Sequence, residues 1–136
     1  MLPFSMAFQP GISLYEQVIY AAKKAIISGQ MQPGDAFPSV RNLSTELKIN
    51  PNTAHKVVSH LLDQGLLEVR PGMGTVVAAP PDSSAKERAR LINNEAEQLV
   101  VEAMRLGLSL AEVTAAVIAH WQRLEQRSFT RGAGKK

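Results

Sequence analysis

A short helix expected over residues 51–64 constrains the fold more than any other feature of the sequence. Asn50 can accept hydrogen bonds from the free N–H groups at its start, and Pro51 suits the first helical position because no partner is needed for the N–H it lacks. Gly65 is the expected stop. Apolar residues recur every three or four positions, so one face must be buried. The residues of this face are Ala54, Val57, Val58, Leu61 and Leu62.

The opposite face of this helix is polar and carries hydrogen-bond donors without a carboxylate. Its residues are Asn52, Thr53, His55, Lys56 and Ser59. Such a face suits a helix laid in the major groove of DNA, with Lys56 neutralising a phosphate and Thr53 contacting a phosphate or a thymine methyl group. Two roles stay open. Asn52 could pair with adenine or cap its own helix, and His55 could read a base or only face solvent.

A second short helix is expected just before the first, from Ser39 to Leu47. Ser39 can cap it, and residues 48–50 connect it tightly to the next helix. This spacing is that of a helix-turn-helix, although an ordinary αα-corner has the same spacing. Arg41 is the strongest single candidate for DNA contact, because a guanidinium can bind guanine or phosphate through two hydrogen bonds and no acid lies three or four residues away. The alternative for Arg41 is a surface ion pair.

Residues 66–69 and 75–77 are expected to form the two strands of a β-hairpin. A hairpin that directly follows a helix-turn-helix is a wing, and its tip is a second place to contact DNA. Arg70 can reach a phosphate or a narrow minor groove, and Gly72 and Gly74 allow backbone N–H groups to approach phosphates. The simpler interpretation is that both glycines only make the turn.

The rest of the chain predicts a helix over residues 13–28, a stiff linker over residues 78–83 that contains the prolines 80–81, and two further helices. Ser84 with Glu87, and Ser109 with Glu112, form capping boxes at the starts of these last two helices. Each helix has an apolar seam too large for one helical hairpin to bury, so we expect it to pair with a second subunit. The expected dimer residues are Ile92, Ala96, Leu99, Ala103, Leu106, Leu110, Val113, Val117, Trp121 and Leu124.

The predicted fold class is therefore mainly α with a small β-hairpin (α+β). Residues 1–79 are expected to form a winged helix-turn-helix DNA-binding domain, and residues 80–127 a two-helix dimerisation module. Residues 128–136 are polar and basic and are expected to be a disordered tail.

Composition limits the function classes more than it selects among them. The 136 residues carry a net charge of +3, but residues 1–79 hold six Lys and Arg against five Asp and Glu, a balance of only +1. DNA binding must therefore rest on the placement of particular residues. Without cysteine there is no disulfide and no thiolate zinc site, and the three histidines are too scattered for a metal site. We expect a soluble cytoplasmic protein with no cofactor, no metal, no membrane contact and no enzymatic activity.

Residues 37–43, 50–53, 65–66 and 70–75 form an ordered series of motifs. Together they resemble the GntR family of bacterial transcription regulators. Residues 15–17, Gly29 with residues 33–35, and residues 50–53 look like the YtrA subfamily in particular. The resemblance implies a winged helix followed by a small dimerisation module. It also implies DNA contacts by residues of the second helix, the recognition helix and the wing. These are Ser39, Arg41, Asn52, Thr53, His55, Lys56, Arg70, Gly72, Gly74 and Thr75.

One departure matters for DNA reading. Many relatives carry an arginine where this chain has Pro51, so base reading must shift to other residues.

The leading hypothesis is a homodimeric repressor that binds a palindromic operator of double-stranded DNA. The family resemblance implies that such a protein often controls its own operon and a neighbouring transporter. The alternative is a protein-interaction module in which the paired C-terminal helices carry the function and the winged helix is structural. An enzyme is excluded because the sequence has no nucleophile with a base at plausible spacing and no phosphate loop. A small-molecule effector is possible but unidentified, and a pocket near Trp121 is one place for it.

Overall fold

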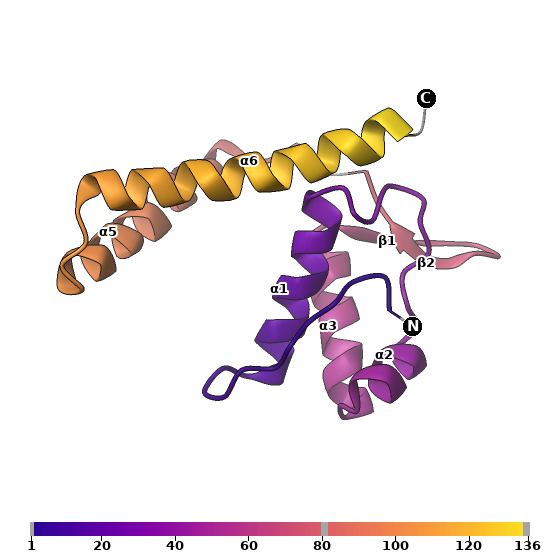
Figure 1. Cartoon of the computed structure of the whole chain (residues 1–136). Helices are drawn as coiled ribbons and strands as arrows, with labels where there is room; N and C mark the ends of the chain where they lie inside the picture. Colours follow the sequence, from indigo (N-terminus) through magenta and orange to yellow (C-terminus); the bar gives the residue numbers. More distant parts are fainter. Residues whose placement is uncertain (1, 80–81, 135–136) are drawn as a thin grey trace. The chain divides into compact units, whose positions relative to one another are not determined.

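The structure, a computed structural model of the chain, describes residues 2–79 and 82–134, and their side chains as far as residue 125 (Figure 1). The chain divides into two compact units, the first built on Met1–Pro81 and the second on Asp82–Gln126. The first unit holds three helices and a hairpin, and the second is helical (Figure 1).

The three helices of the first unit begin at capping side chains, two of which, Ser39 and Asn50, the sequence predicts. α1 spans Leu14–Ile27, and the Ser13 hydroxyl oxygen accepts a hydrogen bond from the Glu16 N–H at 3.1 Å. α2 spans Val40–Leu47 and α3 spans Pro51–Asp63, capped by Ser39 and Asn50 respectively. α3 packs against both other helices, so its apolar face is buried as expected.

A two-stranded antiparallel hairpin follows α3. β1 spans Leu67–Arg70 and β2 spans Gly74–Val77, paired from Leu67 with Val77 to Arg70 with Gly74. The backbone N–H of Phe37 donates to the Thr75 carbonyl at 2.9 Å, beside an isolated bridge from Ala36 to Val76. This bridge and hydrogen bond tie the residues just before α2 to the hairpin.

The N-terminal residues join the core of the first unit, which the sequence reasoning did not predict. Phe4 is only 5% exposed and its ring stacks on Phe37, with centroids 6.2 Å apart. Gln17 donates to the carbonyl oxygens of Gln9 and Ile12 and accepts from the Gln9 N–H. Residues 2–9 therefore form a strap along α1, and we refer to them as the N-terminal strap (Figure 1).

The first helix of the second unit contains an irregular turn. α4 spans Ala85–Arg90 and α5 spans Ala96–Arg105, with a π-helical turn, η1, over Leu91–Glu95. Because a π turn takes more residues than an α turn, it rotates the residues before it relative to those after it. The single continuous seam predicted along this helix is therefore interrupted.

The second helix of this unit, α6, spans Leu110–Gly134. Both predicted capping boxes are present, at Ser84 and at Ser109. Helix α6 runs on through residues 128–134, and the disorder expected of the tail at residues 128–136 stays a prediction. No proline or glycine interrupts residues 110–131, and basic residues suit the C-terminal end of a helix. Residues 135–136 of that predicted tail lie outside the described residues.

The two units differ sharply in burial. The core of the first unit gathers apolar side chains from the strap, all three helices and the hairpin. In the second unit, Ala103 is the sole buried residue between positions 82 and 125. Among the described residues, none of the helices combines the length and apolarity needed to cross a membrane.

Candidate nucleic-acid interface

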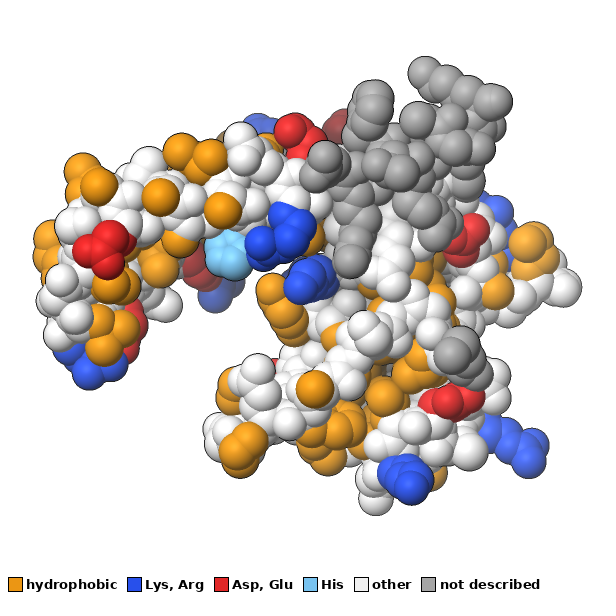
Figure 2. Space-filling view, viewed as in Figure 1, with side chains coloured by type: hydrophobic (Ala, Val, Ile, Leu, Met, Phe, Trp, Pro, Cys, Tyr) orange, Lys and Arg blue, Asp and Glu red, His pale blue; other side chains and the backbone are white. Residues whose placement is uncertain are grey.

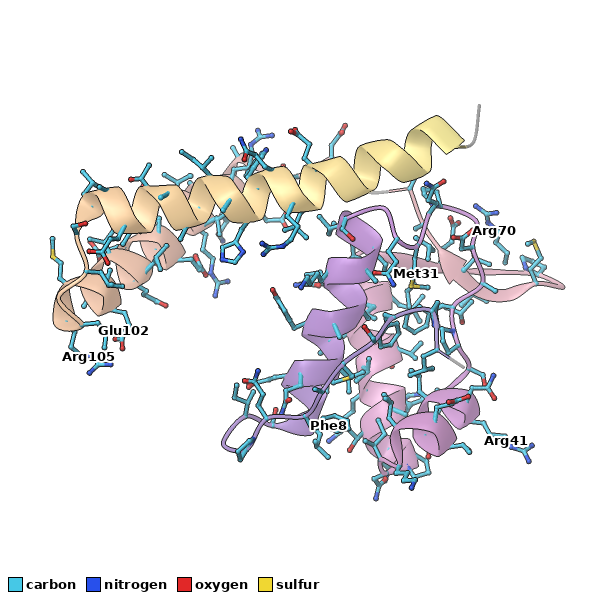
Figure 3. All side chains as sticks on the ribbon, viewed as in Figure 1. Phe8, Met31, Arg41, Arg70, Glu102 and Arg105 are labelled. Atoms are coloured by element: carbon cyan, nitrogen blue, oxygen red, sulfur yellow. The ribbon has the colours of Figure 1, made fainter. Side chains whose placement is uncertain are left out.

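The start of α2 presents two of the predicted DNA contacts. The Ser39 hydroxyl oxygen accepts a hydrogen bond from the Asn42 N–H at 3.1 Å, which leaves the hydroxyl proton free to donate elsewhere. Arg41, in the first turn, is exposed and projects away from the unit (Figure 3). It makes no ion pair with any described residue, so the surface ion pair considered as its alternative role is absent from this part of the chain.

The start of α3 shows which asparagine caps the helix. Asn50 Oδ1 accepts a hydrogen bond from the Asn52 N–H at 2.7 Å. The Asn52 side chain is exposed and has no hydrogen-bond partner among the described residues, so its amide is free for an outside partner. His55 and Lys56 are exposed on the following turn, and Thr53 is half-buried.

The polar face of α3 has limits that the sequence reasoning did not draw. Asp63 is exposed in the last turn and lies seven residues after Lys56, close to the same face. The face is therefore free of carboxylates only as far as Ser59. His60 packs its ring edge-on against Tyr15 of α1, with centroids 6.1 Å apart. That histidine belongs to the contact between two helices.

The wing brings Arg70 into an ion pair. Its Nη2 atom lies 3.2 Å from Glu68 Oε1, and the two side chains are 42% and 44% exposed. Arg41 and Arg70 thus differ: one guanidinium has no acidic partner in the described residues, and the other already has one on its own strand.

The glycines of the wing are required by backbone conformation. Gly72 has φ +79° and Gly74 has φ +80°, a region that other residues rarely adopt. An added Cβ would meet no atom within 4 Å at either position, so space does not require glycine there. Met73 lies between them and is 59% exposed. The sequence reasoning overlooked this apolar residue, although an apolar side chain at the tip of a hairpin could have marked it.

A groove of about 910 Å³ joins the start of α2 to the wing. Ser39 lines it from α2, Gly74 and Thr75 line it from β2, and the strap contributes Leu2 and Pro3. The structure therefore brings together three of the predicted contacts from two separate stretches of sequence. Glu46 also lines the groove and gives it one acidic residue.

The comparisons with known proteins agree with this geometry. The family model described as "Bacterial regulatory proteins, gntR family" matches residues 14–77. The chain is 34% identical over 101 residues to the HTH-type transcriptional repressor YtrA of Bacillus subtilis, which covers 74% of this chain and 78% of that repressor. The chain belongs to the GntR family. Because this is a family of regulatory proteins, the expectation that the chain is not an enzyme is confirmed.

Solved structures share the fold of this GntR protein. A transcriptional antiterminator from Listeria monocytogenes EGD-e superposes with a TM-score of 0.77 at 24% identity, covering 90% of this chain and 92% of that one. A GntR family transcriptional regulator from Listeria monocytogenes gives a TM-score of 0.57 at 25% identity, covering 82% and 98%. The predicted winged-helix fold is confirmed, and so is the likeness to YtrA.

In this GntR protein, half of the predicted dimer residues face the groove between α5 and α6. That groove encloses about 420 Å³. The predicted residues that line it are Leu99, Ala103, Leu106, Val113 and Val117. Ala103 is 6% exposed and packs inside the hairpin, so it has little surface left for a partner. Ile92 lies in the π turn, and Ala96 directly follows it.

Other apolar residues of the second unit face outward. Leu110 is 82% exposed and Trp121 67% exposed, while Leu124 is half-buried. Val101, Met104 and Ile118 are also exposed, although they were not predicted as interface residues. Figure 2 shows hydrophobic side chains scattered over the visible surface of this unit. The pocket suggested beside Trp121 stays a prediction.

Proposed function

We propose that this GntR protein is a homodimeric transcription repressor that binds a palindromic operator, and that the operon it controls includes its own gene. The observation that carries the proposal is the start of α3. Asn50 caps the helix, which leaves the Asn52 amide exposed, and without a partner among the described residues, beside His55 and Lys56. A helix of this kind can lie in the major groove with its N-terminal residues against base edges.

The other predicted contacts have roles that follow from their surroundings. Arg41 is the candidate for reading guanine, because its guanidinium has no acidic partner among the described residues. Ser39 and Thr75, which share the groove between α2 and the wing, are suited to phosphate oxygens. Gly72 and Gly74 let the wing backbone approach a phosphate. If Arg70 contacts DNA, its positive charge is shared between the DNA and the Glu68 carboxylate.

The dimer in this proposal forms through the second unit. Its apolar side chains are exposed in a single chain, and a second copy offers the same surface for them to pack against. A two-fold symmetric protein requires a two-fold symmetric site, with half-sites about 34–36 Å apart, one helical turn of DNA. The protein would act in the cytoplasm.

The test measures, by fluorescence anisotropy at increasing salt concentration, the binding of the protein to the promoter upstream of its own gene. We expect tight binding at low salt, protection of two half-sites one turn apart, and a marked loss in Arg41→Ala. Absence of binding at low salt, or an Arg41→Ala variant that binds like the wild type, would contradict the proposal.

The alternative, a protein-interaction module, draws on the same exposed apolar surface. Leu110 and Trp121 could pack against a different protein as well as against a second copy. A chain that is monomeric in solution, binds no DNA at any salt concentration and forms a defined complex through these residues would favour this alternative.

A further inference from the structure

A cavity of about 660 Å³ lies in the first unit between the N-terminal strap and α1. Its volume is in the range of small-molecule sites, about 300–1,000 Å³. Phe4 and Met6 line it from the strap, and Ala21 and Ala25 line it from α1. These two helix positions carry only methyl groups, and Gln17 is hydrogen-bonded to Gln9 at the end of the strap and to the Ile12 carbonyl beyond it.

One ridge of α1 places opposite charges at the two ends of this cavity. Glu16, Tyr20 and Lys24 all line it and are four residues apart, so they follow one another along the helix. The first and last are separated by about 12 Å along the axis. Neither Glu16 nor Lys24 makes an ion pair with another described residue, and all three side chains are exposed.

We propose that this cavity binds an elongated zwitterion, namely a short peptide with free termini. Its ammonium group would lie against Glu16 and its carboxylate against Lys24, with its apolar middle over Ala21 and Phe4. An extended tripeptide spans about 10 Å, which fits the separation of the two charges once the length of the side chains is allowed for.

The strap connects this cavity to the DNA-facing groove. Phe4, at its centre, stacks on Phe37, whose N–H donates to Thr75 of the wing. Leu2 and Pro3, at its start, line the groove that contains Ser39. Figure 3 shows the strap, where Phe8 is labelled, running beside α1 toward α2 and the hairpin.

A peptide bound under the strap favours the arrangement in which the strap is docked on α1. It thereby also favours the observed positions of the α2 start and the wing. Peptide binding therefore strengthens operator binding, and by linkage the operator strengthens peptide binding by the same factor. This regulatory half of the inference rests on the proposed DNA binding, whereas the peptide site itself does not.

The first experiment omits DNA. The full chain, labelled with nitrogen-15, is titrated with a randomised tripeptide pool with free termini, and proton–nitrogen NMR spectra are recorded. We expect the largest shifts at the residues that line the cavity, within residues 4–12, within residues 16–25 and at Gln30, and none with a matched pool that is acetylated and amidated. Lys24→Ala and Glu16→Gln should each weaken the response at least several-fold.

Lys23→Ala is the matched control, because it removes the same charge from the neighbouring position but does not line the cavity. It should respond like the wild type. No response to the free pool, a response equal with blocked peptides, or one unchanged in Lys24→Ala would overturn the peptide site.

The second experiment measures operator affinity by anisotropy with and without the free pool. We expect an increase of about five-fold or more, the lower end of typical coupling between two sites, that is absent in Lys24→Ala and kept in Lys23→Ala. Operator binding that the pool leaves unchanged overturns the regulatory half. A protein that responds to peptides in the first experiment but binds no operator overturns the proposed function and leaves the peptide site standing.

Discussion

At the scale of single residues, two arginines that were both predicted to contact DNA have different surroundings. Arg41 has no acidic partner among the described residues, whereas Arg70 is bound to Glu68 at 3.2 Å. We expect Arg41→Ala to lower operator affinity by about 1–3 kcal/mol and to relax the preference for guanine at one position. Arg70→Ala should cost less, because its charge is already shared. Anisotropy on the operator and on base-substituted operators measures both. Equal losses in the two variants would mean that the ion pair does not decide their roles.

Two asparagines at the start of α3, its N-cap Asn50 and Asn52 in its first turn, form a second matched pair. Asn50 accepts the hydrogen bond that caps the helix, so Asn50→Ala should lower the free energy of unfolding by about 1 kcal/mol. Asn52 is exposed and its amide is unpaired among the described residues, so Asn52→Ala should change stability by less than about 0.5 kcal/mol and weaken operator binding. Urea unfolding and anisotropy separate the two effects. A destabilised Asn52→Ala variant would show that its side chain supports the helix after all.

At the scale of elements, the wing carries an exposed apolar residue at its tip. Met73 is 59% exposed between two glycines with positive φ, and a thioether releases no counterion from DNA. We expect Met73→Ala to weaken operator binding without changing its salt dependence. Met73→Lys should steepen the plot of log affinity against log salt by about 0.9. Affinities at four or more salt concentrations measure this slope. If the wing does not contact DNA, the operator affinity and its salt slope will be unchanged in both variants.

The caps and turns of this chain could be predicted from sequence because their causes are local. Ser39 and Asn50 bond to N–H groups two or three residues away, and Ser84 and Ser109 form their capping boxes within four residues. The polar face of α3 followed from the same short range. Asp63 in the last turn could have been placed by the same periodicity, because it lies one helical turn after Ser59.

The features that were missed depend on contacts distant in sequence. Phe4 is buried because it stacks on Phe37, thirty-three positions later, and nothing in residues 1–8 alone signals that partner. The π turn at Leu91–Glu95 adds a residue to the helix without a proline or glycine to mark it. Because of this extra residue, a regular spacing of three and four residues does not place all the apolar residues of this helix on one face.

At the scale of the whole molecule, the two units bury their apolar surface to very different extents. The core of the first unit contains side chains from the strap, the three helices and the hairpin. In the second unit, Leu110 is 82% exposed and Trp121 is 67% exposed. In the proposed function this exposed apolar surface is an interaction site: a second copy covers it, and each first unit then binds one half-site. Loss of the dimer should therefore weaken DNA binding far more than loss of any one contact.

We expect the double variant Leu110→Glu with Trp121→Gln to sediment as a monomer in analytical ultracentrifugation, where the wild type sediments as a dimer. Both side chains are exposed in the single chain, so folding should persist. Operator affinity should fall by about 10²-fold or more, because two half-sites are no longer bound by one molecule. Ile27→Gln, on α1 and 57% exposed, is the control and should stay dimeric. A double variant that remains a dimer would place the interface elsewhere, and a monomeric wild type that still protects both half-sites would contradict dimeric recognition itself.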